Sequence, residues 1–248
     1  MTLWRSFAAM LALFLITACD RLPDYRYKMT IYVNTPDGER SFSSVRQVRV
    51  DETPSIVDSS GMRQKVTLEG EALILDLPGR TVYALLSQPN NPDYAAYVPS
   101  AALGPYGSSG AKLSEAQQEL REAKGDGRPN ARAEEAERLR EMIDVAGAKE
   151  LPHTRPNTDP YRGPREIDQW PMFVEFGDPN DPKSVRAVDP ADLGIKRITI
   201  EITSEKTTHG IRDRLPWLAK IKGRSLSGGF TAVGSPYGLD TGSFELGQ

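Results

Sequence analysis

The chain has 248 residues, with 31 basic and 34 acidic side chains and a net charge of −3. This length allows one large or two small domains, and the near-neutral charge argues against nucleic acid as a partner. The single cysteine excludes an intramolecular disulfide, so the fold must rely on its apolar core. The 19 prolines and 21 glycines predict many turns and long connections.

Residues 1–18 have the parts of a secretory signal peptide. Arg5 lies in a short polar start, the apolar run Phe7–Ile16 follows, and small residues lead to Cys19. The run is too short for the ~20 residues that cross a bilayer as a helix. The stretch Ile16–Cys19 resembles the lipobox of bacterial lipoproteins, which implies acylation of the Cys19 thiol and cleavage just before it. A cleaved signal without lipid, or a buried N-terminal helix, is the alternative.

The lipobox resemblance implies where the protein works. Residues 19–24 would tether it to a membrane, with the rest facing the periplasm. One acyl chain binds only marginally, but a diacyl group with an N-acyl chain holds firmly. Asp20 resembles the inner-membrane retention signal of enteric-type lipoproteins, which favours the inner membrane. Lipidation would also remove the Cys19 thiol from redox or metal chemistry.

The first folded segment is predicted to be an antiparallel hairpin. Apolar and polar residues alternate over Tyr25–Val33, which is typical of a half-buried strand. Residues 34–38 supply proline and glycine for a turn, and 41–50 continue as a second strand. The apolar phase of that strand shifts between Val45 and Val48, which predicts a β-bulge.

The next segment is also predicted to be β-rich. Residues 64–77 favour one or two strands interrupted at Gly70, and 81–86 favour a strand buried on both faces. Tyr94 and Tyr97 then fall in a stretch predicted to be irregular. Their rings either line a sugar or peptide site or hold a long loop against the sheet.

Residues 113–148 change the period of the pattern. Apolar residues recur at spacings of three and four in two runs, which predicts an inserted αα-hairpin with a narrow apolar stripe on each helix. The stripes would pack against each other, against the sheet or against a partner helix.

The C-terminal half returns to β structure. Residues 151–169 are proline-rich and predicted to be irregular, whereas 170–176 and 184–188 favour strands. Alternation over 198–202 predicts a strand with one buried and one solvated face. The segment 211–218 is short, basic and aromatic, and its proline limits any helix.

Several stretches resemble a group of uncharacterised proteobacterial envelope proteins. They are residues 24–30 and 34–38 near the start and 181–185, 198–202 and 210–218 near the end. The resemblance implies one domain assembled from N- and C-terminal strands, and it implies no activity. We therefore expect a single β-rich domain over 25–248 that carries the insert 113–148.

A partner surface is predicted at Arg212, Arg214 and Trp217, with Tyr94 and Tyr97 as further members. Two guanidinium groups beside an indole suit an anionic or aromatic partner. The alternative is that Trp217 and its neighbours close the core.

Motifs that suggest catalysis or metal binding are weak. Asp240–Gly242 matches the short aspartic-protease motif, but a single copy favours a plain turn. Asp178, Asn180 and Asp181 lack the glycine and glutamate of a calcium loop. The two histidines have no nucleophile elbow beside them. We predict no cofactor, no metal and no catalytic residue.

The sequence favours an α+β fold dominated by antiparallel sheet, as a sandwich or partly open barrel with the αα-hairpin inserted. The favoured function is a membrane-anchored envelope lipoprotein that binds an envelope protein or cell-wall component. The alternative is a hydrolase acting on peptidoglycan or polysaccharide through two carboxyl groups.

Overall fold

The computed structural model describes residues 23–54, 62–89, 91–104, 138–157, 163, 165–221, 226 and 239–247. For residues 51–54 and 62–65 the structure describes the backbone alone. Cys19, the signal segment 1–18 and most of the insert 113–148 lie outside the described residues. None of the described helices is long and apolar enough to cross a membrane.

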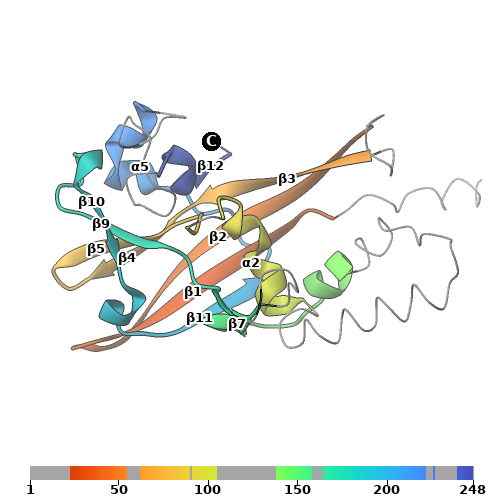
Figure 1. Cartoon of the computed structure of the whole chain (residues 1–248), viewed down its shortest axis with the longest axis horizontal. Coiled ribbons are helices and arrows are strands. Elements are labelled where there is room, and N and C mark those ends of the chain that lie inside the picture. Colours follow the sequence, from red (N-terminus) through yellow and green to blue (C-terminus); the bar gives the residue numbers. More distant parts are fainter. Residues whose placement is uncertain are drawn as a thin grey trace, which may run out of the picture.

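The larger of two main sheets has six antiparallel strands in the order β12-β3-β2-β1-β11-β6 (Figure 1). Its strands are β1 (Tyr25–Thr35), β2 (Gly38–Pro54), β3 (Met62–Glu71), β6 (Lys149–Leu151), β11 (Ile195–Ile202) and β12 (Glu245–Leu246). Strand β1 lies in the middle because it pairs with β2 on one side and β11 on the other. Alternating residues bury one face of β1 and of β11.

The smaller sheet has four antiparallel strands in the order β10-β9-β5-β4, and β7 and β8 form a separate ribbon. Its strands are β4 (Leu73–Leu77), β5 (Arg80–Ala84), β9 (Phe173–Phe176) and β10 (Val185–Val188), and the ribbon comprises β7 (Thr154–Pro156) and β8 (Glu166–Asp168). The labelled helices are α2 (Tyr94–Leu103) and α5 (Ile211–Arg214), and residues 138–143 are also helical. The 3-10 turns are η2 (Pro182–Ser184), η3 (Pro190–Leu193), η4 (Pro216–Ala219) and η6 (Thr241–Ser243).

The main core lies between the inner face of the large sheet and the layer that covers it. Met29 and Ile31 from β1 pack in one cluster with Leu75 from β4, Phe173 from β9 and residues of α2. The α+β class with predominantly antiparallel sheets is confirmed, and the described strands form no closed barrel.

A second core covers the other face of the small sheet. Side chains of β5 alternate, so that Val82 faces the main core and Tyr83 faces the second one. The C-terminal turns supply Leu218 and Phe244 to this second cluster. The small sheet is therefore buried on both faces, as predicted for residues 81–86.

The first hairpin is confirmed, but the bulge predicted in its second strand is wrong. The β1–β2 register runs without a shift from Tyr25 opposite Val48 to Thr35 opposite Gly38. Val45 is buried on the outer face instead, and its backbone N–H and C=O both bond to Thr208. A second burial partner, not an extra residue, explains the shift in apolar phase.

Two segments predicted to be irregular contain regular structure. Tyr94 and Tyr97 lie in α2, whose buried side chains pack against the main core. The proline-rich connection 151–169 contains β7 and β8. Of the predicted αα-hairpin, only its second half is described in part: residues 138–143 are helical, and Leu139 and Ile143 pack against the core.

Candidate functional site

Three side chains of the predicted partner surface, Arg212, Arg214 and Trp217, have partners within the protein. Arg212 makes a bidentate pair with Glu245, with Nε–Oε2 and Nη2–Oε1 distances of 2.8 Å. Arg214 Nη2 lies 2.7 Å from Asp76 Oδ2. Trp217 is 5% exposed, and its Nε1 donates to the carbonyl oxygen of Pro179. These side chains fasten the C-terminal turns onto the rest of the fold.

The structure also separates the two tyrosines of that predicted surface. Tyr94 is 4% exposed and packs in the main core, whereas Tyr97 is 54% exposed on the other side of α2. Trp217 and Tyr94 therefore do not present their rings to solvent. Partner binding by Tyr97 stays a prediction.

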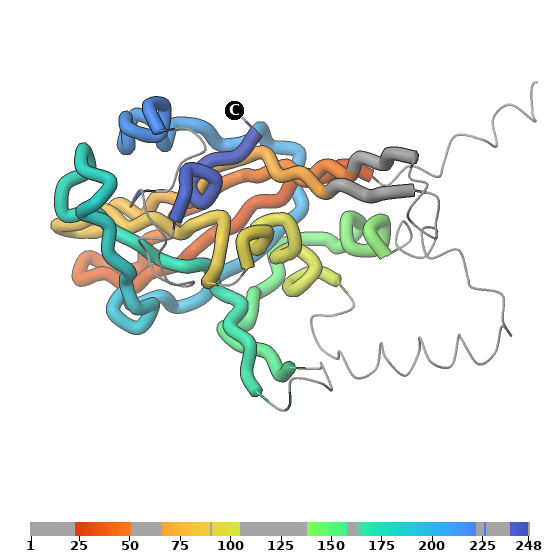
Figure 2. Tube along the Cα trace, turned by 45° about the horizontal axis from the view of Figure 1, so that its top comes forward, coloured from red at the N-terminus to blue at the C-terminus, as the bar shows by residue number. Residues whose placement is uncertain are grey.

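A different surface has an open, mainly apolar groove of about 350 Å³. It lies between β3, the start of α2 and the C-terminal strand β12, which run side by side in Figure 2 (orange, yellow and dark blue). Its volume is within the range of small ligand-binding sites. The lining residues are Val66, Thr67, Leu68, Leu86, Pro92, Asp93, Ala95, Ala96, Leu246 and Gly247. We call this surface the β3 groove.

Hydrogen bonds between distant segments hold the walls of the β3 groove. The Leu86 N–H donates to the Ser243 carbonyl, and the Ala95 N–H donates to the Leu86 carbonyl. Tyr27 Oη, from the central strand β1, donates to the Ala95 carbonyl at 2.5 Å. The first turn of α2 is thus fixed to both the sheet and the C-terminal segment, which keeps the groove preformed.

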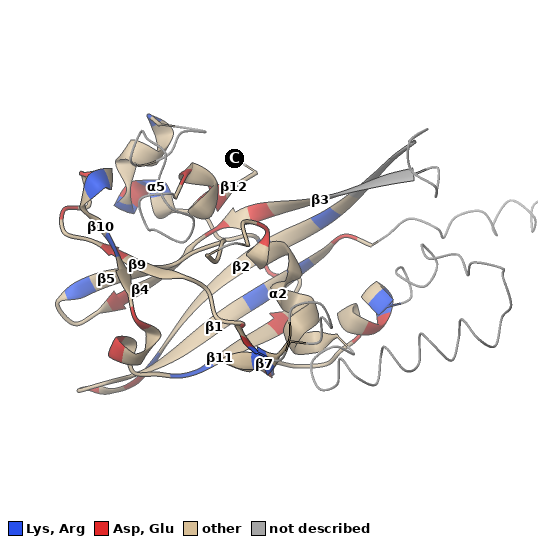
Figure 3. Ribbon diagram, viewed as in Figure 1, with Lys and Arg blue, Asp and Glu red and all other residues tan. Residues whose placement is uncertain are grey.

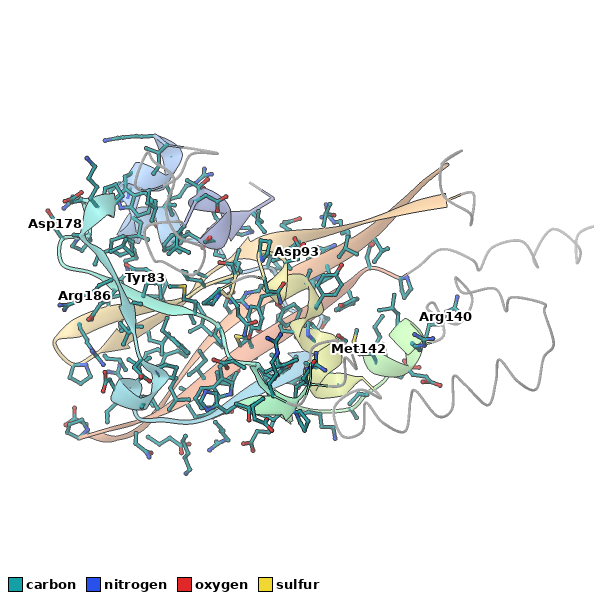
Figure 4. All side chains as sticks on the ribbon, viewed as in Figure 1. Tyr83, Asp93, Arg140, Met142, Asp178 and Arg186 are labelled. Carbon is teal, nitrogen blue, oxygen red and sulfur yellow. The ribbon has the colours of Figure 1, made fainter. Side chains whose placement is uncertain are left out.

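Among the described lining residues of the groove, Asp93 is the one ionisable residue. It occupies the N-cap position of α2, but its side chain makes no capping hydrogen bond, and it is exposed. Figure 4 labels Asp93 where α2 begins, next to β3. Its carboxylate is therefore available to a cation or N–H donor of a ligand.

Among the described residues, strand β3 has a free edge beside the groove. Within the described residues, β12 pairs only with Glu71 and Gly70 of β3. Edge strands with unpaired N–H and C=O groups are ready to pair with another chain. The outer face of the large sheet is charged rather than apolar, and its charged side chains pair with one another, as in Lys28–Glu205 and Arg49–Glu69. Basic and acidic residues are interspersed over the described part of the fold (Figure 3).

A buried polar cluster lies on the inner face of the large sheet, close to the start of α2. Arg46 is fully buried; its Nε donates to the Glu71 carbonyl, and its Nη1 donates to Tyr27 Oη at 3.4 Å. Gly70 makes room for it, since a Cβ there would lie 2.8 Å from Arg46 Cγ. Arg46 Nη2 and Tyr94 Oη have no hydrogen-bond partner among the described residues.

Replacing the two buried tyrosines by phenylalanine is expected to have opposite effects. Tyr27→Phe removes the bond to Ala95 and leaves a buried acceptor unpaired, which lowers the free energy of unfolding by about 1–3 kcal/mol. Tyr94→Phe removes an unpaired buried hydroxyl and is expected to raise it by about 1 kcal/mol. Urea unfolding of both variants checks this pair. Equal losses in the two would contradict the assignment of partners.

Stability is expected to fall at alkaline pH. Burial raises the pKa of Tyr83 to about 12, and burial also raises the pKa of Tyr27 and of Tyr94. Above the ordinary tyrosine pKa of about 10, the unfolded chain loses protons that the folded chain keeps, so unfolding becomes more favourable. Melting temperatures should hold up to about pH 10 and then drop towards pH 12. The drop should be smaller in Tyr94→Phe, and an equal drop would contradict it.

The remaining sequence motifs have structural roles. Asp240 accepts from the Ser243 N–H and so caps η6, in agreement with a plain turn. Asp178 accepts from the Asn180 N–H, and Asp181 caps η2. The described residues contain no group of three or more His, Cys, Asp or Glu side chains placed to hold a metal ion.

Comparisons with family models, with curated proteins and with solved structures find no match to this chain.

Proposed function

We propose that this chain is a membrane-anchored bacterial envelope lipoprotein that acts as a binding or accessory protein, with the β3 groove as its partner-binding surface. The anchor is proposed from the lipobox-like stretch Ile16–Cys19. The binding role is carried by one observation: an apolar groove opens directly beside a strand edge that is unpaired within the described part of the chain.

The composition of the groove favours binding over catalysis. Hydrolysis of glycosidic bonds ordinarily uses two carboxyl groups roughly 5–10 Å apart. Among the lining residues Asp93 is the one carboxylate, and the rest are apolar or uncharged. Such a lining suits an apolar segment of a protein partner better than a sugar chain, which needs several polar contacts.

The proposed anchor would keep the groove close to the membrane. Strand β1 begins at Tyr25, a few residues after Cys19. At about 3.3–3.6 Å per extended residue, a tether over 19–24 spans roughly 20 Å. A partner would therefore be a membrane-proximal envelope protein or cell-wall-associated protein. Asp20 favours the periplasmic face of the inner membrane.

Photo-crosslinking in the cell tests the binding role. A photoreactive residue at Pro92, on the groove, should give a defined adduct, and one at Asp37, in the β1–β2 turn, should not. Ala96→Glu places a charge in the groove and should lower the adduct yield at Pro92 at least tenfold. Ala187→Glu, at an exposed alanine of β10, is the matched control and should leave it unchanged.

The adduct must also come from the folded protein. Because Ala96 is 8% exposed, Ala96→Glu is expected to lower the melting temperature; a cooperative melt well above the assay temperature in both variants excludes unfolding as the cause of a lost adduct. The proposal fails if Pro92 gives no adduct, or if the adduct survives Ala96→Glu.

A further inference from the structure

We infer that the partner binds as an extended segment that adds an antiparallel strand along β3, with alternate apolar side chains in the β3 groove and a basic side chain at Asp93. This inference rests on the proposed binding function and specifies the chemistry of the ligand.

The backbone of β3 has its free hydrogen-bonding groups in the right place. The N–H and C=O groups of Val45 bond to Thr208 and so point away from β1. Because these groups alternate in direction along a strand, those of Gln47 and Arg49 also point away from β1, towards β3. Their partners Glu69 and Thr67 bond back to β2.

By alternation, the N–H and C=O groups of Leu68 and Val66 point to the free edge. The Ala72 N–H, just after β3, donates to the Phe244 carbonyl, so the backbone groups of this even-numbered residue also point away from β2. An added strand would therefore find two residues of β3 that are unpaired among the described residues, each with a donor and an acceptor.

Strand β12 already shows how an added strand would sit. It runs antiparallel to β3, with Leu246 opposite Gly70, and the Leu246 side chain lines the groove and packs against the main core. Gly247 lies against Glu69, where a Cβ would come within 2.9 Å of the Glu69 Cβ. A ligand strand would continue this line from Leu68 towards Met62.

The side chains beside that line define the pattern of the ligand. Val66 and Leu68 lie on the inner face, opposite Val50 and Val48 of β2, and both line the groove. Every second ligand residue would face them and the small side chain of Ala96. Residues between them would face the polar outer side.

Charge complementarity supplies the remaining feature. The exposed Asp93 carboxylate has no capping partner and lies in an otherwise uncharged lining. A lysine or arginine of the ligand would pair with it. The expected ligand is thus an extended segment with apolar residues at alternate positions and one basic residue.

Selection from a library of random ten-residue peptides against the purified full chain in detergent tests this inference. The Ala96→Glu protein serves for counter-selection. Enriched peptides should alternate apolar and polar residues and contain lysine or arginine. Peptides selected for binding to the Asp93→Asn protein should keep the alternation but no longer contain the basic residue.

N-methylation of an enriched peptide then tests the backbone pairing without altering the protein. In an antiparallel addition, the groove-facing residues direct their N–H groups to Leu68 and Val66. Methylating one of these nitrogens should weaken binding about tenfold or more, whereas methylating the intervening nitrogens should change it less than twofold.

Other outcomes overturn the inference. The reverse parity would mean parallel addition, and insensitivity at both parities would mean binding without strand pairing. Enriched peptides with apolar residues at helical spacing, or no enrichment at all, would mean that the groove does not bind an extended segment. A concentration-dependent dimer of the chain that blocks peptide binding would mean that a second copy of the chain binds there. In each case a Pro92 adduct that Ala96→Glu abolishes would leave the proposed function standing.

Discussion

Phe244→Ala is expected to lower the free energy of unfolding by about 3–5 kcal/mol. Phe244 is fully buried, and its ring centroid lies 5.7–6.4 Å from the ring centroids of Tyr83, Phe176 and Trp217. Truncation would remove these aromatic contacts and leave a cavity between the small sheet and the C-terminal turns. Urea unfolding monitored by tryptophan fluorescence measures the change.

The matched control is Tyr97→Ala, which truncates an exposed aromatic side chain and should change stability by less than about 0.5 kcal/mol. A loss below about 1 kcal/mol in Phe244→Ala would contradict the second core, because a fully buried phenylalanine ordinarily costs several times more.

The second large effect is expected at Arg46. Arg46→Ala removes most of a fully buried side chain and should lower the free energy of unfolding by about 3 kcal/mol or more. Arg46→Met keeps most of the volume and removes a buried charge that has no carboxylate hydrogen-bonded to it among the described residues. Replacing a buried charge by an apolar side chain of similar size is often neutral or stabilising, so Arg46→Met should stay within about 1 kcal/mol of wild type.

The comparison of the two Arg46 variants separates packing from polar contacts. If Arg46→Met loses as much as Arg46→Ala, the bonds to Glu71 and Tyr27 carry the stability rather than the volume. Thermal and urea unfolding of both variants give this difference directly. Groove binding should be weaker in Arg46→Ala, because Arg46 supports Tyr27, which fixes α2 at Ala95.

Local periodicity predicted much of the fold. The alternation over Tyr25–Val33 and at Ile198 and Ile200 marks residues that are fully or almost fully buried in the central strands. Such strands are predictable because one face meets the core and the other meets water. The buried strand at 81–86 was also predicted, since its composition leaves no polar face.

Long-range packing explains what the sequence did not predict. Alternation cannot tell that Val45 is covered by the segment around Thr208, nor that the tyrosine-containing stretch forms helix α2 against the main core. Arg212 has a surface-like composition, but Glu245, distant in sequence, pairs with it. Trp217 agrees with the alternative prediction, since it packs in the second core and donates to the Pro179 carbonyl.

The β3 groove was missed for a related reason. Alternation at Val66 and Leu68 shows a strand, but whether that strand is central or at the edge depends on the sheet order. Asp93 gives a weak local signal, as an acidic residue directly before a helix, and that signal ordinarily indicates capping.

Intact mass of the membrane-extracted protein, measured beside a Cys19→Ser variant, is the most direct test of anchored function. We predict a wild-type mass that begins at Cys19 and carries added acyl chains, with none on the variant. An unmodified wild-type chain recovered without membranes would contradict the lipid anchor and the membrane-proximal partner.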